Sequence, residues 1–159
     1  STQCVMHYQG SNEEVTIPST WNGQPVTVIF DDIFKGHTEI TKVNIPDTIT
    51  DIGGFVFDGC VNLINITLPD SITEMWQYAF VRSGIKEITL PPKMTRLSPY
   101  VFSECKNLKT VTCPAGLKQI GGWAFKQCTA LTDLYVSKNT KISDKAFEGC
   151  NEVTIHYID

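Results

Sequence analysis

Residues 45–69 read IPDTITDIGGFVFDGCVNLINITLP, and the rest of the chain repeats this pattern. The central phenylalanine recurs at intervals of 22 or 23 residues, at Phe34, Phe57, Phe80, Phe102, Phe125 and Phe147. An aliphatic residue follows most of these phenylalanines after six residues, as Leu63 follows Phe57. A unit of this length cannot bury its own apolar face, so it must stack on its neighbours. The sequence therefore predicts a solenoid.

Each repeat contains one segment typical of a strand and one typical of a tight turn. The alternation of apolar and polar residues from Leu63 to Thr67 predicts a short strand, which Pro69 ends. Successive strands are expected to pair in parallel, about 4.8 Å apart. The segment around each phenylalanine predicts one helical or 3₁₀ turn on the other face, followed by glycines that suit a positive φ (Gly36, Gly59 and Gly149). The predicted fold class is an α/β repeat solenoid.

Composition narrows the classes of protein to which the chain can belong. It has 159 residues, with 13 Lys and Arg against 17 Asp and Glu, and a net charge of -4. One domain is the usual expectation at this length. The acidic balance argues against a nucleic-acid partner, and no apolar run approaches the ~18 residues of a membrane span. The missing initiator Met and leader pattern favour a signal peptide that has been removed.

The repeat closely resembles the BspA-type leucine-rich repeat, also called the treponemal class. The resemblance rests on Ile45-Pro46, Ile52-Gly53, Phe57, Gly59-Cys60 and Leu63, and the copy around Phe125 matches as well. It implies a right-handed leucine-rich-repeat coil with a parallel β-ladder, forming a single domain over residues 1–159. Within that domain, we expect an N-terminal cap and first strand at 1–16, repeats at 17–150 and a terminating strand at 151–159.

Two copies depart from the family pattern. Phe30 and Trp76 stand at the position that is usually glycine, and His37 and Ser83 stand at the position that is usually cysteine. The copy that contains Trp76 and Ser83 is also one residue short. These departures do not change the expected fold, but they mark places where the surface is individual to this chain.

Four of the six cysteines fall in one column of the repeat: Cys60, Cys105, Cys128 and Cys150. We expect free thiols there, because buried cysteine behaves as a small hydrophobic residue. Stacked side chains that point the same way also have poor geometry for a disulfide, although their Cα atoms are close enough. Cys113 replaces an aliphatic residue and is expected in the core. The redox state of Cys4 is left open.

No constellation of residues predicts catalysis, and we expect neither a cofactor nor a metal. The histidines His7, His37 and His156 lie far apart in the sequence, and a solenoid keeps such positions apart. No cysteine pair has the CxxC spacing of a zinc site. The glycine pairs at 53–54 and 121–122 do not match a phosphate-binding loop. We therefore expect a protein that is not an enzyme.

Two surfaces are candidates for ligand binding. In leucine-rich repeats, the residues between the inward aliphatics face the concave side, which here gives a polar strand face: Lys42, Asn44, Asn65, Thr67, Glu87, Thr89, Thr110, Thr112, Asp133 and Tyr135. The alternative is an aromatic surface on the turn side, formed by Phe55, Trp76, Tyr78, Tyr100 and Trp123. Each also has a structural interpretation, because threonine suits an exposed strand and aromatic residues can pack one repeat on the next. Tyr and Trp are also common anchors of interfaces.

The resemblance implies a non-catalytic binding module of a secreted or cell-surface protein. Surface proteins of this type in bacteria and protozoa adhere to host matrix proteins or to other cells. The expected partner is a protein or a glycan ligand. The alternative function is a structural stalk or scaffold that presents another domain. We expect a monomer or a weak end-to-end dimer, because the terminal strands of a solenoid can pair with a second chain.

Overall fold

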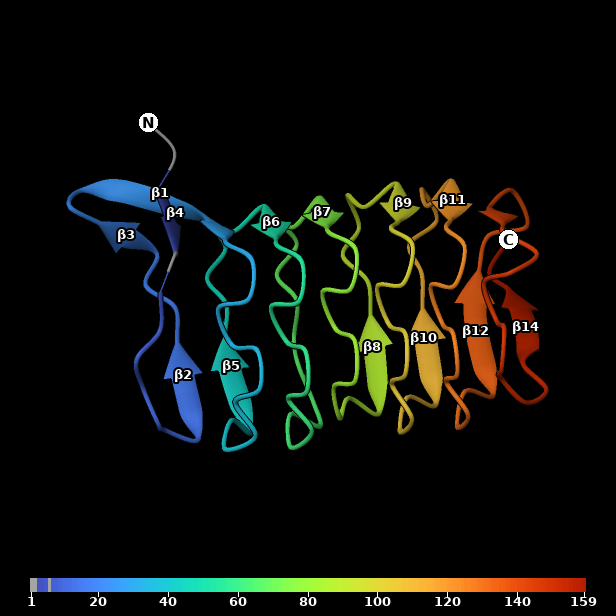
Figure 1. Cartoon of the computed structure of the whole chain (residues 1–159). Helices are drawn as coiled ribbons and strands as arrows, with labels where there is room; N and C mark the ends of the chain where they lie inside the picture. The colour runs from blue at the N-terminus through green and yellow to red at the C-terminus, as the bar shows by residue number, and fades with distance from the viewer. Residues whose placement is uncertain (1–2, 6) are drawn as a thin grey trace.

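The computed structural model describes residues 3–5 and 7–159 and shows a parallel β-solenoid (Figure 1). Successive turns of the chain, here called coils, lie side by side from the N-terminal end to the C-terminal end. Two rows of short strands run along opposite edges of the stack (Figure 1). The stacked coils and their parallel pairing confirm the solenoid that the repeat predicts.

The first row of strands follows the alternating segments of the repeats. It consists of β2 (Glu14–Thr16), β5 (Lys42–Asn44), β8 (Glu87–Thr89), β10 (Thr110–Thr112), β12 (Asp133–Val136) and β14 (Thr154–Tyr157). β2 pairs with β5, while β8, β10, β12 and β14 form one parallel sheet. In that sheet Val111 lies between Ile88 and Leu134, and all three side chains are buried. The side chains on either side of them therefore face solvent.

The second row lies at the opposite edge of the stack (Figure 1). It consists of β4 (Gln24–Ile29), β6 (Asp51–Ile52), β7 (Glu74–Met75), β9 (Arg96–Leu97), β11 (Gln119–Ile120) and β13 (Lys141–Ile142). β4, β6 and β7 pair in parallel, and so do β9, β11 and β13. β6, β7, β9 and β11 each bury one apolar side chain, such as Ile52 or Leu97, next to a more exposed polar residue.

A hairpin extends the second row at the N-terminal end. β3 (Thr20–Trp21) pairs antiparallel with β4, and the turn residues Asn22 and Gly23 have φ of 50° and 73°. Two positive φ values in a two-residue loop are typical of a type I′ turn. β1 (Gln3–Val5) pairs in parallel with β4 further along, at Val26–Ile29. Two additional strands therefore pair with β4 at this end.

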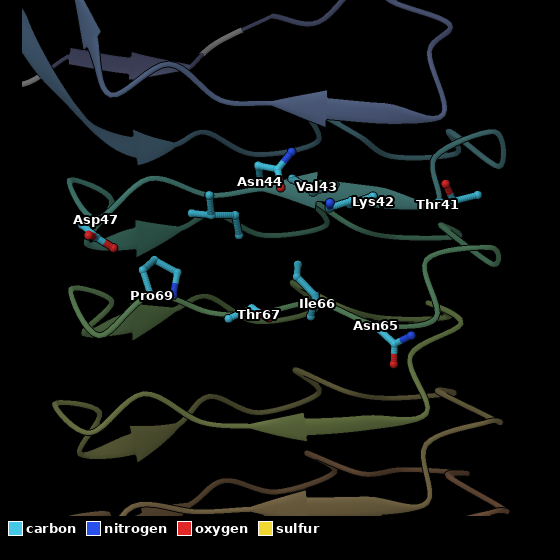
Figure 2. A pocket seen from close by; sticks show the side chains of 10 residues that line it. Thr41, Lys42, Val43, Asn44, Asp47, Asn65, Ile66, Thr67 and Pro69 are labelled. Atoms are coloured by element: carbon cyan, nitrogen blue, oxygen red, sulfur yellow. The ribbon is translucent and has the colours of Figure 1, made fainter.

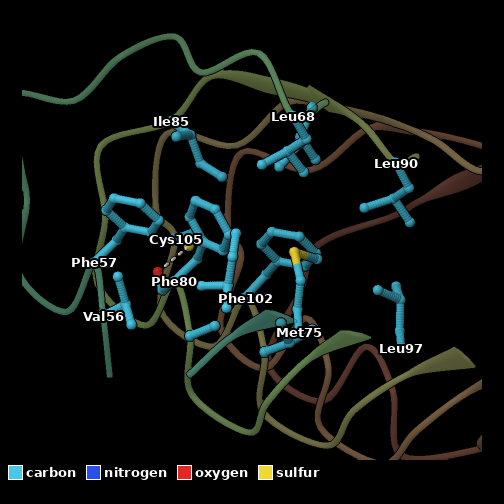
Figure 3. Close-up of a cluster of buried hydrophobic side chains, with 14 of the residues drawn as sticks. Val56, Phe57, Leu68, Met75, Phe80, Ile85, Leu90, Leu97, Phe102 and Cys105 are labelled. Carbon is cyan, nitrogen blue, oxygen red and sulfur yellow. Dashed lines mark hydrogen bonds between the residues drawn. The ribbon is translucent and has the colours of Figure 1, made fainter. Parts of the chain in front are cut away.

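A row of phenylalanine rings runs through the core (Figure 3). Neighbouring ring centroids lie 4.8–5.8 Å apart from Phe34 to Phe147. The cysteine column lies beside this row, and Cys105 Sγ donates a hydrogen bond of 3.0 Å to the Phe80 carbonyl. Each repeat thus contributes one ring to a continuous apolar stack.

Five cysteines are free thiols: Cys60, Cys105, Cys113, Cys128 and Cys150. This confirms the prediction for the column, and Cys113 is buried in the core as expected. The side chain of Cys4 lies outside the described structure. The cysteines of the column fill small apolar positions, and their thiols bond to the carbonyls of the preceding coil.

The segment around each phenylalanine is not helical, contrary to the prediction. None of the described residues lies in a helix, and none forms a helix long and apolar enough to span a membrane. Phe55 and Gly59 have φ of 59° and 73°. A helix needs consecutive residues with negative φ, so two left-handed residues four positions apart prevent one. Single i→i+3 hydrogen bonds remain, such as the one of 3.1 Å from Cys60 N to Phe57 O.

These turns also bond to the next coil. The amides of Phe57 and Gly59 donate to the carbonyls of Ala79 and Val81 at 2.8 and 3.1 Å. The predicted positive φ is confirmed at the glycines, with 76° at Gly36, 73° at Gly59 and 79° at Gly149. We call this side of the solenoid the turn face. Its hydrogen bonds link each coil to the next.

Both rows of strands are interrupted near the middle of the chain. In the first row, residues 65–68 were predicted as part of a strand, but no backbone hydrogen bond of the described structure joins them to β5 or β8. In the second row, β7 and β9 do not pair within the described residues. The turn face continues across this region, through bonds from Gly59 to Val81 and from Phe80 to Val101. The two halves of the solenoid are therefore joined chiefly by the turn face and the core. One bond from Lys86 N to Ile64 O, at 3.0 Å, and one from Ser98 Oγ to Met75 O, at 2.8 Å, link them within the two rows.

Candidate ligand-binding surfaces

The ten residues predicted for the strand face lie on the solvent side of the first row. All ten are exposed or half-buried: Lys42, Asn44, Asn65, Thr67, Glu87, Thr89, Thr110, Thr112, Asp133 and Tyr135. Pairing brings Glu87, Thr110 and Asp133 into one row across three strands. A second row contains Thr89, Thr112 and Tyr135. The strand face thus presents two parallel lines of hydroxyl, carboxylate and aromatic groups.

The unpaired segment 65–68 divides the strand face. A cleft of about 450 Å³ lies on its β5 side, lined by Lys42, Asn44 and Asp47 together with Asn65 and Thr67 (Figure 2). A second cleft of about 450 Å³ lies on its β8 side, beside Glu87, Thr89 and Thr110. The amides and carbonyls of 65–67 are therefore open to a ligand, as the polar side chains around them are. Paired strands would have used these backbone groups within the sheet.

The C-terminal end of the strand face includes a histidine that the sequence analysis missed. His156 Nε2 lies 2.8 Å from Asp133 Oδ1, and its ring stacks on Tyr135 with centroids 4.5 Å apart. The hydrogen bond from His156 and a second one from Thr132 hold the pKa of Asp133 below its ordinary value. The sequence could have revealed this contact, because the spacing of 21 residues between Leu134 and Ile155 aligns Tyr135 with His156.

The N-terminal end of the strand face also extends beyond the predicted residues. Glu14 and Thr16 lie opposite Lys42 and Asn44 in β5. Asn44 Nδ2 donates to Glu14 Oε1 and to Thr16 Oγ1, each at 3.0 Å. The hydrogen bond from Asn44 and the charge of Lys42 lower the pKa of Glu14. β2 falls in the segment predicted as N-terminal cap and first strand, and its polar side chains were not among the predicted site residues.

Four of the five predicted aromatic residues form a stack on the turn face, which we call the aromatic ladder. Its rings are Phe55, Tyr78, Tyr100 and Trp123, with successive centroids 4.8, 4.7 and 5.1 Å apart and planes within 10° of parallel. Lys35 Nζ lies 4.9 Å from the Phe55 centroid at one end, and Lys145 Nζ lies 5.6 Å from the Trp123 centroid at the other. The ladder therefore turns its ring edges, not its ring faces, to solvent.

Trp76 does not belong to this ladder. Its side chain is 50% exposed, and its ring makes no aromatic or cation–π contact with the described residues. Trp76 and Phe30, another exposed aromatic residue, line a cleft at the second row of strands together with Phe55 and Tyr78 of the ladder. Trp76 thus shares a cleft with two ladder residues but lies outside the ladder's stack of rings.

Four of the buried titratable groups are thiols. Burial raises the pKa of Cys60, Cys105 and Cys113 to about 12 and the pKa of Cys128 still further. Since the thiolate is the nucleophile and the metal ligand, such groups are unreactive at neutral pH. Within the described residues, no group of three or more His, Cys, Asp or Glu side chains could hold a metal ion.

Comparison with known proteins places the repeat in a family. A family model described as "BspA type Leucine rich repeat region (6 copies)" matches residues 27–154. Among solved structures, the chain is similar to the Leucine Rich Repeat protein of T. pallidum, with 27% identity and a TM-score of 0.78 over 97% of this chain and 76% of that one. The sequence matches none of the curated proteins with which it was compared.

A second similar structure is a leucine rich cell surface protein from Faecalibacterium prausnitzii. It is 29% identical, with a TM-score of 0.69 over 96% of this chain and 49% of that one. The chain thus spans about half the length of that protein. The similarity to both structures extends over almost all of the chain.

Proposed function

The chain belongs to the BspA-type leucine-rich repeat family, and from that premise we propose that it is a non-catalytic binding module of a secreted or cell-surface protein. Its ligand is an extracellular protein or a glycan, and its role is adhesion. The similarity to a leucine rich cell surface protein supports the location. No nucleic acid and no membrane insertion are part of this function.

The divided strand face is the observation that carries the proposal. Polar side chains lie in register on both sides of segment 65–68, and the backbone of that segment is free to bond to a ligand. Peptides and glycans both offer rows of donors and acceptors that match such a surface. Tyr135 and His156 add an aromatic pair at one end, which suits the anchoring role of aromatic residues in interfaces.

A binding screen against an array of glycans and extracellular-matrix proteins tests the proposal. The purified chain is expected to bind at least one member, and the variant Asn65→Ala/Thr110→Ala/Tyr135→Ala is expected to lose that binding. The matched control is Asn107→Ala/Thr129→Ala/Trp21→Ala, which changes the same kinds of residue at exposed positions away from the strand face. Absence of binding across the array, or equal loss in both variants, contradicts a role for the strand face.

The alternative is a stalk that presents another domain, and the continuous stacks favour it. The core phenylalanines and the aromatic ladder each run through several coils without interruption. Such stacking stiffens a solenoid along its axis. A chain that binds nothing in the screen, yet holds two fused fluorescent domains at one fixed distance by energy transfer, would favour the stalk.

A further inference from the structure

A cleft at the second row of strands lies between two aromatic residues that replace glycine. Pairing aligns Ile29, Ile52 and Met75, so the residues that follow them, Phe30, Gly53 and Trp76, occupy three adjacent coils. The cleft has a volume of about 570 Å³, and both aromatic side chains line it. It lies on the edge of the solenoid opposite the strand face (Figure 1). Ligand binding there is independent of the proposed function of the strand face.

Only glycine fits at position 53. A Cβ atom at this position would lie 2.5 Å from Asp31 Oδ1 and 2.9 Å from the Ile29 carbonyl, so no side chain fits without displacing the backbone. The coil between Phe30 and Trp76 therefore contributes no side chain at this position. Coils one step apart are about 5 Å from each other, so the backbones of Phe30 and Trp76 are about 10 Å apart, which leaves room for one flat group.

Phe30 and Trp76 have free ring faces, whereas Phe55 and Tyr78, which also line the cleft, are stacked in the aromatic ladder. Phe30 and Trp76 are 48% and 50% exposed, and neither ring contacts another aromatic or a cation among the described residues. In the aromatic ladder, by contrast, each ring face is covered by a neighbouring ring or by a lysine. Exposed aromatic surface of this kind is typical of an interaction site.

The cleft also carries negative charge that none of the described residues neutralises. Asp31 and Asp51 line it, no basic residue does, and neither carboxylate forms an ion pair with the described residues. Asp31 Oδ1 accepts the Gly54 amide at 2.8 Å and Asp51 Oδ1 accepts the Thr50 hydroxyl at 2.7 Å, so both are held in place. Each keeps a second oxygen for a ligand. Two fixed carboxylates beside aromatic faces attract a cation.

The chain uses the same combination within itself. Lys35 Nζ lies 4.9 Å from the centroid of Phe55 and 3.8 Å from Asp32 Oδ1. One ring and one carboxylate there hold an ammonium group that belongs to the protein. The cleft repeats this arrangement with two carboxylates and several rings, and its cation is not supplied by the lining residues.

We propose that this cleft binds an arginine side chain presented by a basic segment of a partner protein. Arginine matches the site better than lysine, because its guanidinium is flat, stacks on aromatic faces and donates two parallel hydrogen bonds to a carboxylate. In the bound state the guanidinium lies between Phe30 and Trp76 and donates to Asp31 or Asp51. The partner therefore meets the solenoid at an edge that the strand face does not use.

Nuclear magnetic resonance titration with two matched peptides tests this proposal. One peptide carries a single arginine between glycines, with blocked ends, and the other carries citrulline, which has the same shape but no charge. We expect the arginine peptide to shift the indole N–H signal of Trp76 at millimolar concentration, and the citrulline peptide to bind about tenfold more weakly.

The variants Trp76→Ala and Asp51→Asn are each expected to weaken binding of the arginine peptide about five- to tenfold. Trp21→Ala, another exposed tryptophan far along the chain, is the control and should bind as the wild type does. Unchanged thermal unfolding identifies variants that remain folded, and the citrulline comparison on the wild type needs no variant. Equal binding of the two peptides, no shift at Trp76, or equal weakening by Trp21→Ala overturns the proposal.

Discussion

Arg82 donates two parallel hydrogen bonds of 2.9 Å to Asp58 of the preceding coil, from Nε to Oδ1 and from Nη2 to Oδ2. The Asp58 side chain is buried, whereas the arginine side chain is 56% exposed. The contact raises the pKa of the Arg82 guanidinium above its ordinary value. Arg82 also has φ of 56° at a position where Gly36 and Gly59 stand in earlier coils. The ion pair therefore coexists with an unfavourable backbone conformation.

Two substitutions at Arg82 separate these effects. Arg82→Ala leaves Asp58 buried without its partner and is expected to lower the free energy of unfolding by about 1–3 kcal/mol. Arg82→Gly loses the same partner but relaxes the positive φ, so its loss should be smaller by about 1 kcal/mol. Urea unfolding followed by circular dichroism measures both. A glycine variant that is no more stable than the alanine variant would contradict the role of the backbone.

The position of a phenylalanine in the core stack should determine how much it stabilises the protein. Phe80 is fully buried between Phe57 and Phe102, and Phe147 is half-buried with one ring neighbour, Phe125. Phe80→Ala should therefore lower the free energy of unfolding by about 3–5 kcal/mol, as core aromatic truncations do. Phe147→Ala should cost about half as much or less, because it disrupts one interface between coils. Equal losses in chemical denaturation would rule out this dependence on neighbours.

Alkaline pH should destabilise the protein through its buried thiols. Burial raises the pKa of Cys113 from 9.0 to about 12, so above pH 9 the unfolded chain loses a proton that the folded chain retains. The stability from this group is fully present below pH 9 and is lost as pH rises towards 12. Each pH unit in that interval costs about 1.4 kcal/mol for one such thiol.

Cys113→Val provides the comparison, because valine fills an apolar strand position and does not titrate. The difference in free energy of unfolding between pH 9 and pH 10 should be smaller for Cys113→Val than for the wild type by about 1 kcal/mol. All other ionisable groups are the same in both proteins, so their contributions cancel. Identical pH profiles would show that Cys113 ionises freely in the folded state.

Hydrogen exchange should reveal the interruption of the first row of strands. The amides of Ile66 and Thr67 have no inter-coil partner in the described structure, whereas Val111 lies in the middle of a sheet. Amides without protein partners exchange through small local openings, so those at 66 and 67 should exchange roughly a hundredfold or more faster than that of Val111. Slow exchange at 66 and 67 would mean that the strand pairs in solution.

The solenoid could be predicted from the sequence because it arises from apolar residues that recur at a nearly constant spacing. The spacing of Phe57 and Phe80 and the alternation around Val111 fix which side chains are buried, and the structure buries them. The helical turns were wrong because a pattern of apolar residues does not reveal the sign of φ. Aromatic residues such as Phe55 and Tyr78 rarely adopt positive φ, and here the hydrogen bonds to the next coil stabilise it.

The candidate surfaces were predicted only in part, for a related reason. The strand face follows from alternation, but whether segment 65–68 pairs depends on the coils on both sides of it. Phe30 and Trp76 stand out in the sequence because they replace the usual glycine. Their placement on either side of Gly53 depends on the pairing of β4 with β6 and of β6 with β7. His156 was set aside because it lies far from the other two histidines, and its contact with Tyr135 was not considered. The features of the candidate surfaces that the sequence did not predict are therefore the contacts between coils.

The interrupted rows and the continuous turn face give the molecule a bending stiffness that depends on direction. Flexion that widens the strand face at residues 65–68 strains one neighbouring backbone hydrogen bond, that of 3.0 Å from Lys86 N to Ile64 O. Flexion that opens the turn face would have to separate the stacked rings of Phe55 and Tyr78 and the bond from Gly59 to Val81. When a force pulls the two ends of the solenoid apart, the turn face therefore bears most of the load. The solenoid begins to extend elastically at the strand face.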